Sequence, residues 1–237
     1  MTEKEIIDLF SSFKNHKILI VGDSMIDAYM WGDIKRMSPE APVPVVEINK
    51  HENRLGGAAN VARNLKALGA TPILCSVIGK DNQGILFKKL MGKEGLSFDG
   101  ILTSEDRKTT IKTRVISEKK HQLRVDEEDT HPINNENQLL SLIDNLLKDI
   151  SVVILQDYNK GVLTPDIIEK VIQSANTKGI PTIVDPKKKN FLSYKNCNIF
   201  KPNLKEIKRG LNIEFDSNNN VELENASKIL REKLNVK

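Results

Sequence analysis

The sequence predicts an α/β fold in which helices flank a mostly parallel central sheet and a small second sheet forms a lid. Short apolar runs alternate with helical patterns along the chain, which is typical of βαβ units. The apolar runs end in polar residues, as buried strands do where their carboxyl ends face a ligand. Two further segments alternate apolar and polar residues and suit a separate, partly exposed sheet.

The predicted core strands are short, continuous apolar runs, as expected for strands buried on both faces of a sheet. In chain order they cover residues 17–21, 72–78, 152–155, 181–184 and 199–200. The first reads Lys-Ile-Leu-Ile-Val and ends at Gly22-Asp23. Because helical segments separate most of these runs, right-handed crossovers would lay the strands parallel in one sheet.

The predicted helices carry apolar residues at helical spacing, and several stop at a glycine. In chain order they cover residues 3–13, 58–68, 81–93, 136–147, 165–178 and 225–234. The helix at 165–178 has the clearest ends, because Thr164 suits an N-cap, Pro165 suits the first turn and Gly179 suits the stop. The asparagine run at 218–220 is predicted to be a surface loop.

Two segments predict the lid. Residues 32–53 hold three prolines and alternating valines, which suits edge strands better than a core element. Residues 108–125 alternate well and predict a hairpin with its turn near 118–121. We expect these segments, bounded approximately by residues 33–54 and 108–126, to pair as one small sheet that projects from the main body.

Composition restricts the class of protein. The 237 residues are 39% apolar and 29% charged, with a net charge of +4, which fits one ordered α/β domain. The one dense basic run, 187–189, is predicted to be a solvated loop rather than a nucleic-acid site. No stretch approaches the ~20 apolar residues of a membrane span, and Cys75 and Cys197 lack the spacing of a disulfide framework or zinc site. We therefore expect a cytoplasmic protein without membrane or nucleic-acid partners.

Polar side chains collect just after the predicted strands. Asp23, Asp27, Asp157, Asp185 and Asn203 all occupy such positions. In open α/β sheets, ligands bind beyond the carboxyl ends of the strands, and carboxylates bind hydroxyl groups strongly. Each of these residues taken singly is explained as a turn former or helix cap. Together they predict a pocket for a polyhydroxylated molecule.

A glycine pair, Gly56-Gly57, stands at the start of the helix predicted from residue 58. Such a pair lets the backbone approach a ligand closely and leaves N–H groups free to bind it. The pair does not form a G-x-G-x-x-G motif directly after the first strand, so a dinucleotide-binding fold is disfavoured.

These residues match a known family. The run Gly56-Gly57-Ala58-Ala59-Asn60-Val61-Ala62, followed by Leu68-Gly69, resembles the N-terminal signature of the PfkB/ribokinase sugar kinases. The motif Lys201-Pro202-Asn203 with Glu206 resembles the nucleotide and magnesium motif of that family. The resemblance covers essentially the whole chain. It implies a ribokinase-like fold whose lid covers the sugar, excludes water from the transfer and can form a homodimer interface.

One segment resembles a particular subfamily of these sugar kinases. Residues 36–45, Arg-Met-Ser-Pro-Glu-Ala-Pro-Val-Pro-Val, resemble the flap of bacterial heptose 7-phosphate kinases, which feed ADP-heptose synthesis for lipopolysaccharide. Residues 157–161 and 185–187 resemble further motifs of that subfamily. The implied reaction is ATP-dependent phosphorylation of D-glycero-D-manno-heptose 7-phosphate at the anomeric hydroxyl to give the 1,7-bisphosphate. The alternatives are a kinase of this family for another sugar and a non-catalytic protein that binds a sugar phosphate.

The resemblance also implies residue roles. The substrate-binding positions would be Asp23, Asp27, Arg36, Gly56, Gly57, Asn60, Asp157 and Lys160. Arg36 would reach in from the lid toward the substrate's phosphate, where its fork geometry suits an anion, and Lys160 is a second candidate for that phosphate. The positions facing ATP would be Asp185, Lys187, Lys201, Asn203 and Glu206, with Asn203 and Glu206 nearest to Mg²⁺.

The family's catalytic base is the Asp of a Gly-Ala-Gly-Asp loop, whose backbone N–H groups also form an anion hole. No such tetrapeptide occurs in the 237 residues. The resemblance therefore predicts that this Asp lies beyond Lys237, and that the chain is an incomplete ribokinase-like domain that is inactive alone. Neither Asp23 nor Asp27 is expected to replace the base. Missing late elements would leave apolar sheet surface uncovered, so poor solubility is expected.

Overall fold

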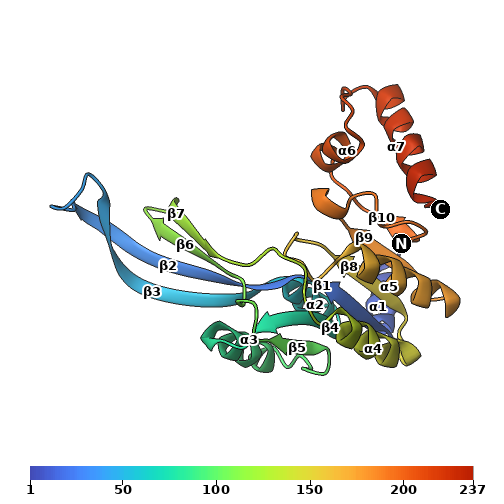
Figure 1. The fold of residues 1–237 in the computed structure, drawn as a ribbon, viewed down its shortest axis with the longest axis horizontal. Coiled ribbons are helices and arrows are strands. Elements are labelled where there is room, and N and C mark those ends of the chain that lie inside the picture. Colours follow the sequence, from blue (N-terminus) through green and yellow to red (C-terminus); the bar gives the residue numbers. More distant parts are fainter. Residues whose placement is uncertain (237) are drawn as a thin grey trace.

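The computed structural model describes residues 1–236 and contains two sheets (Figure 1). The central sheet has the strand order β10-β9-β8-β1-β4-β5, and every pairing in it is parallel. Its strands are β1 (Lys17–Gly22), β4 (Thr71–Gly79), β5 (Ile101–Ser104), β8 (Val152–Gln156), β9 (Thr182–Asp185) and β10 (Ile199–Phe200). The predicted α/β class with a mostly parallel sheet is confirmed.

Helices cover both faces of the central sheet (Figure 1). They are α1 (Glu3–Ser12), α2 (Ala58–Ala67), α3 (Asn82–Lys93), α4 (Glu136–Leu146), α5 (Pro165–Thr177), α6 (Leu204–Leu211) and α7 (Asn220–Leu234), with short 3₁₀ helices at Phe13–Asn15, Leu147–Asp149 and Lys188–Asn190. Alternate residues of β1 enter different cores. Leu19 and Val21 belong to the cluster with α4 and α5, whereas Ile20 belongs to the cluster with α2 and α3.

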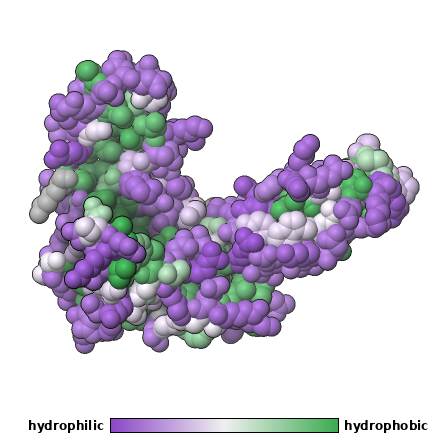
Figure 2. Space-filling view, turned by 180° about the vertical axis from the view of Figure 1, so that it is seen from behind, coloured by the Kyte–Doolittle hydropathy of each residue, from purple (hydrophilic) through white to green (hydrophobic). Residues whose placement is uncertain are grey.

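A four-stranded sheet of order β3-β2-β6-β7 projects from this body (Figure 1). Its strands are β2 (Ser24–Met37), β3 (Pro44–Gly57), β6 (Ile111–Ser117) and β7 (Lys120–Glu127). The pairing of β2 with β6 confirms that the flap and the hairpin form one sheet. The hairpin turns at Glu118 and Lys119, which both have positive φ. Figure 2 shows that this sheet is largely hydrophilic outside, with apolar patches along it.

Several elements differ from the sequence-based expectation. Strand β2 begins at Ser24, directly after the first core strand, because residues 24–31 pair in continuous register with residues 57–50. Strand β5 and helix α6 were not predicted, since one has four residues and the other is short and mostly polar. Helix α7 begins inside the predicted asparagine loop, because Asn219 accepts hydrogen bonds from the N–H groups of Val221 and Glu222 and caps the helix.

The predicted ends of α5 are confirmed. The Thr164 hydroxyl accepts a hydrogen bond from the Ile167 N–H at 3.3 Å, Pro165 is the first helical residue, and Gly179 follows with a φ of 69°. Within residues 1–236, no helix combines the length and the apolar composition needed to cross a membrane.

Candidate functional site

Asp23, at the carboxyl end of β1, holds the loop that follows β8. Its carboxylate accepts hydrogen bonds from the N–H groups of Tyr158, Lys160 and Val162 at 2.8, 3.0 and 3.0 Å. Asp23 is only 1% exposed. Burial, together with the charge of Asp157, raises the pKa of Asp23 against the opposing effect of these hydrogen bonds. Both oxygens of Asp23 are therefore bonded without any sugar hydroxyl, which differs from the sequence-based expectation.

Asp157, at the end of β8, is also enclosed by protein donors. Its carboxylate accepts hydrogen bonds from the Tyr194 hydroxyl at 2.8 Å, the Asn159 N–H at 2.7 Å and the Asn190 amide at 3.4 Å. Burial is the main cause that raises the pKa of Tyr194, and the negative charge of Asp157 adds to it. The predicted sugar contact of Asp157 would require these donors to be displaced.

Asp27 is the aspartate that stays open to a ligand. It lies near the base of β2, is 23% exposed, and accepts a hydrogen bond from Arg114 of β6 at 2.7 Å. Gly56 faces it on β3: a Cβ there would lie 2.4 Å from the Asp27 Oδ2 atom. Any larger residue at this position would force the Asp27 carboxylate to shift.

The turn from β3 into α2 lies against the end of β1. Gly57 is the N-cap of α2, with a φ of 59°, and a Cβ there would lie 2.4 Å from the Asp23 carbonyl oxygen. The next N–H, of Ala58, donates to that same oxygen at 2.9 Å. Asn60 follows on the first turn of α2 and is partly exposed. The structure thus brings the glycine pair, Asp27 and the start of α2 to one place.

Lys160 joins the loop after β8 to the four-stranded sheet. Its amine contacts the Glu128 carboxylate at 2.6 Å, and Lys112 of β6 contacts the other oxygen of Glu128 at 2.7 Å. Burial raises the pKa of Glu128, but the two lysines outweigh it and hold the pKa below its ordinary value. The guanidinium of buried Arg107 also donates to the carbonyl of Lys160. This ion-pair cluster fixes the loop against the sheet.

The residues predicted to face ATP also lie together, at the ends of β9 and β10. Asp185 contacts Lys201 at 3.2 Å, and Lys187 contacts Glu206 at 2.7 Å. Asn203 and Glu206 form a capping box at the start of α6, each bonding the other's backbone N–H. Lys187 is therefore part-buried and ion-paired, which corrects the expectation that the whole lysine run is a solvated loop.

Glu206, the residue that the resemblance places nearest to Mg²⁺, has both oxygens engaged, Oε1 by the Lys187 amine and Oε2 by the Asn203 N–H. One of its oxygens already meets a cation, the Lys187 amine, so the position suits positive charge. Within residues 1–236, no three His, Cys, Asp or Glu side chains form a metal-binding group. Mg²⁺ often binds through one or two carboxylates, with phosphate oxygens and waters completing its shell. The residues present fit such a partial site.

Tyr158, in the loop after β8, contacts Asp23 through its N–H and Lys187 through its ring. The Lys187 amine is 5.7 Å from the centre of its ring, a cation–π distance. Burial raises the pKa of Tyr158, and the charges of Asp185, Asp27 and Asp23 raise it further against the opposing effect of Lys187. The phenol is therefore within electrostatic range of both the Asp27 side and the Lys187 side.

Arg36 is the predicted site residue that the structure does not bring to this place. It lies on β2 nine residues beyond Asp27 and one residue before the strand ends at Met37. That end of β2 is at the outer end of the projecting sheet (Figure 1). At ~3.3 Å per strand residue the separation is about 30 Å. Arg36 therefore cannot reach a substrate bound at Asp27 of the same chain, contrary to the sequence-based expectation.

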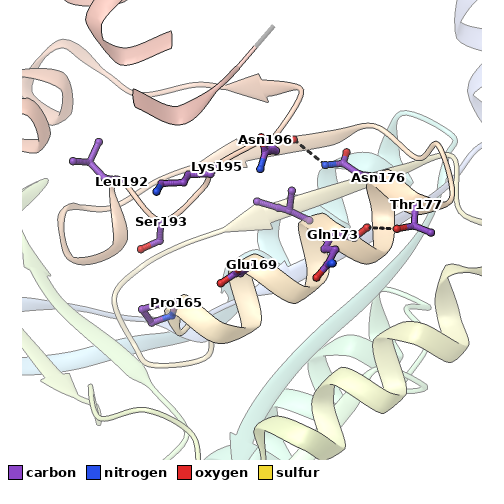
Figure 3. Close-up of a pocket in the computed structure, with 10 residues that line it drawn as sticks. Pro165, Glu169, Gln173, Asn176, Thr177, Leu192, Ser193, Lys195 and Asn196 are labelled. Carbon is purple, nitrogen blue, oxygen red and sulfur yellow. Dashed lines mark hydrogen bonds between the residues drawn. The ribbon is translucent and has the colours of Figure 1, made fainter. Parts of the chain in front are cut away.

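A groove of about 580 Å³ lies elsewhere, between α5 and the segment 192–196 (Figure 3). The side chains lining it include Glu169 and Gln173 on the helix and Leu192 and Lys195 opposite. None of the predicted site residues lines this groove. The candidate site is the open carboxyl edge of the central sheet.

Sequence arguments missed Arg107, Lys112 and Arg114. Lys112 and Arg114 belong to the segment recognised only as an alternating hairpin, and Arg107 directly precedes that segment. Alternation reveals which face a residue shares but not which carboxylate it meets. The register of β6 beside β2 brings Lys112 and Arg114 next to Asp27 and Tyr29. The basic residues in the predicted lid segment were the only sequence signal that could have indicated these contacts.

Comparisons with known proteins match one family over most of the chain. Residues 15–235 match the family described as pfkB family carbohydrate kinase. The chain is 40% identical over 222 residues to the bifunctional protein HldE of Helicobacter pylori, covering 93% of this chain and 48% of that protein. It is 42% identical over 219 residues to HldE of Campylobacter jejuni subsp. doylei, covering 92% and 45%. The chain spans about half the length of the curated relatives it matches.

Solved structures share the fold at low sequence identity. The tetrameric inhibited form of phosphofructokinase-2 from Escherichia coli superposes with a TM-score of 0.72 at 16% identity, covering 94% of this chain and 71% of that chain. Arabidopsis thaliana ribokinase, complexed with ribose and ATP, gives a TM-score of 0.67 at 15% identity, covering 94% and 70%. Both similarities confirm the ribokinase-like fold.

Proposed function

Because the chain belongs to the pfkB family of carbohydrate kinases, we propose that it provides the sugar side and part of the nucleotide side of a heptose 7-phosphate kinase. The reaction would transfer the γ-phosphoryl group of ATP to the anomeric hydroxyl of D-glycero-D-manno-heptose 7-phosphate. The identity to HldE proteins and the resemblance of residues 36–45 to heptose kinase flaps support this substrate. We treat residues 1–237 as one ribokinase-like domain, whose lid is the four-stranded sheet.

The position of Tyr158 carries the proposal. Phosphoryl transfer depends chiefly on holding the acceptor hydroxyl close to the γ-phosphate and in line with the bond that breaks. The loop that bears Tyr158 is fixed by Asp23, four residues before Asp27, so it adjoins the Asp27 side. The Tyr158 ring is 5.7 Å from the Lys187 amine on the Lys187 side. A sugar at the first and a nucleotide at the second would therefore meet across this loop.

On the sugar side, we assign hydroxyl binding to Asp27, the backbone of Gly56 and Gly57, and Asn60. Asp27 is accessible and already oriented by Arg114. We assign Asp23 and Asp157 to holding the loop, since their oxygens are occupied by protein donors. Neither Asp23 nor Asp27 is assigned as the general base.

On the nucleotide side, Lys187 and Lys201 would bind phosphate oxygens, and Glu206 with Asn203 would hold Mg²⁺ through oxygen and water ligands. Bound Mg²⁺ neutralises phosphate charge, and ATP supplies the transferred group. Asp185 orients Lys201, which it contacts at 3.2 Å. The lid would exclude water from the transfer and join two chains as a homodimer.

Calorimetric titration of the purified chain tests the substrate. We expect heptose 7-phosphate to bind at least ~10-fold more tightly than fructose 6-phosphate, ribose or adenosine, a difference of about 1.4 kcal/mol. Asp27→Asn should lose this binding, because a carboxylate binds a hydroxyl more strongly than an amide does. Glu40→Gln, in the exposed loop between β2 and β3, is the matched control. Equal binding of all four ligands would refute the substrate assignment.

A further inference from the structure

We propose that Lys112 and Lys160 bind the phosphate group that the sugar already carries, and that Glu128 occupies this site until the phosphate displaces it. This inference rests on the proposed function and deepens it, because it names the residues that recognise a phosphorylated sugar. The site lies at the base of the projecting sheet, beside Asp27. Glu128 acts there as a competitor that belongs to the chain itself.

One carboxylate bridges the two lysines of this site. The Lys160 amine contacts the Glu128 Oε1 atom at 2.6 Å, and the Lys112 amine contacts the Oε2 atom at 2.7 Å. A phosphate monoester also presents oxygens in pairs, and it carries about two negative charges. Both amines would therefore keep two charge-assisted hydrogen bonds when the phosphate replaces the carboxylate.

The cluster stands next to the sugar side of the candidate site. Lys112 on β6 is the register partner of Asp27 on β2, and neighbouring strands lie about 4.8 Å apart. The backbone N–H of Lys160 donates to Asp23 at 3.0 Å, which ties Lys160 to the carboxyl end of β1. A sugar bound at Asp27 therefore has this pair of lysines beside it.

Positive charge is in excess around these lysines. Lys112 also contacts Asp126, which is shared with Arg124, so the cluster has three cations for two carboxylates. Arg107 donates to the Lys160 carbonyl, and its Nη1 atom is buried without a hydrogen-bond partner within residues 1–236. A dianionic phosphate would offset this excess better than a single carboxylate does.

The burial of the cluster explains why it holds an anion at all times. Lys112 and Lys160 are each only 14% exposed. An ammonium group that is buried without a partner is strongly destabilising. The two lysines therefore need Glu128 in the free chain, and the phosphate takes over this role when the sugar binds.

Glu128 is able to leave the lysines without disturbing the sheet. Strand β7 ends at Glu127, one residue earlier, so the pairing of β7 with β6 does not include Glu128. Among the residues that the structure describes, its carboxylate contacts only the two lysines. Rotation of this one side chain would release both amines.

The other cations of the projecting sheet suit the phosphate less well. Arg114 contacts Asp27 at 2.7 Å and orients it for a sugar hydroxyl. Arg54 is half-exposed and paired with Glu52. Arg36 lies about 30 Å from Asp27 along β2. The lysine pair is therefore the enclosed cationic site that a sugar at Asp27 meets.

Calorimetric titration with inorganic phosphate tests this site without a sugar. Glu128→Gln removes the competing carboxylate and should bind phosphate at least ~10-fold more tightly than the unaltered chain. Adding Lys112→Gln to that variant should abolish the gain. Glu47→Gln is the matched control, because it removes the same charge from an exposed pair with Lys35. No gain in Glu128→Gln, or an equal gain in Glu47→Gln, would overturn the inference.

A second titration compares heptose 7-phosphate with the same heptose lacking the phosphate. Lys112→Gln should bind the phosphorylated sugar at least ~10-fold more weakly than the unaltered chain, and the other sugar within about twofold. Equal losses for both sugars would overturn the inference, and this result decides it even where urea unfolding shows that Glu128→Gln does not fold. If the unaltered chain binds neither sugar, the substrate assignment fails, whereas the inorganic phosphate titration still tests the lysine site.

Discussion

Asp23 and Asp27 stand four residues apart in the chain, and their surroundings give them different chemistry. Asp23 is enclosed at the end of β1 and receives three backbone N–H groups. Asp27 has entered β2, where it meets one arginine and the open base of the sheet. The difference arises because β2 begins at Ser24. Asp23 therefore lies at the end of β1 in the central sheet, and Asp27 lies within β2 in the projecting sheet.

Replacing each aspartate by asparagine should separate stability from binding. Asp23→Asn leaves one acceptor atom for three N–H donors, so at least one buried donor loses its partner, at about 1–3 kcal/mol. Asp27→Asn weakens one part-exposed ion pair and should cost less than about 1 kcal/mol. Urea unfolding of the two variants measures this difference. Equal losses would contradict the assignment of Asp23 to holding the loop.

Glu128 gives a pH dependence with a definite sign. Lys112 and Lys160 hold its folded-state pKa below the ordinary value of 4.5. Its stabilising contribution is therefore complete above pH 4.5 and is lost as the pH falls through the lower, folded-state pKa. Glu128→Gln should show a shallower loss of unfolding free energy with acidification below pH 4.5 than the unaltered chain. Parallel curves would contradict this, and Glu40→Gln is the exposed control.

At the scale of elements, the turn from β3 into α2 is the most constrained junction of the candidate site. Gly57 has a positive φ and lies against the backbone of Asp23, and the helix start depends on this contact. Gly69, which ends α2, also has a positive φ, but a Cβ there would meet nothing within 4 Å. Both glycines therefore need a backbone conformation with positive φ. Only Gly57 also needs the absence of a Cβ atom, because the Asp23 carbonyl lies close to it.

Alanine substitutions at these glycines should differ accordingly. Gly57→Ala combines backbone strain with overlap on the Asp23 carbonyl, and should cost roughly 2–4 kcal/mol and abolish sugar binding. Gly69→Ala carries the strain alone and should cost about 1 kcal/mol. Thermal and urea unfolding compare them. Similar losses in both variants would show that the close approach at Gly57 is unimportant.

At the scale of the whole molecule, three apolar clusters are unequal in size. Two large clusters cover the two faces of the central sheet. The third is small and gathers α6, α7 and Phe191, and it touches the first through partly buried Phe200 and Val236. Figure 1 shows α6 and α7 standing at one side of the body. Small clusters with few shared contacts open at lower free energy than the core.

Hydrogen exchange should therefore resolve the α6–α7 unit from the rest. We expect its amides to exchange roughly tenfold or more faster than those of α5. Leu230→Ala, in the small cluster, should speed exchange only within 204–234. Leu139→Ala, in the first cluster, should lower global stability by about 2–5 kcal/mol. Uniform protection across both units would contradict this division.

Much of this architecture is readable from the chain alone. Apolar runs and helical periodicity indicated the parallel core, because burial on both faces forces a strand to be continuously apolar. The Thr164 and Pro165 signals located the start of α5, because capping chemistry is local. Strand β5 escaped prediction because it has only four residues. The start of β2 escaped it because residues 24–31 gain their strand partners from residues 50–57, at the far end of the hairpin.

The sequence by itself determined the fold class, the kinase family and the gathering of polar residues at the strand ends, because all three follow from local composition and motif spacing. Only the tertiary structure decided which of those residues are free. In the folded chain, Asp23 and Asp157 are surrounded by backbone and side-chain hydrogen-bond donors, whereas Asp27 is accessible. Arg36 lies about 30 Å from Asp27 along β2. These outcomes depend on pairings between distant segments, and a linear motif carries no information about distance or enclosure.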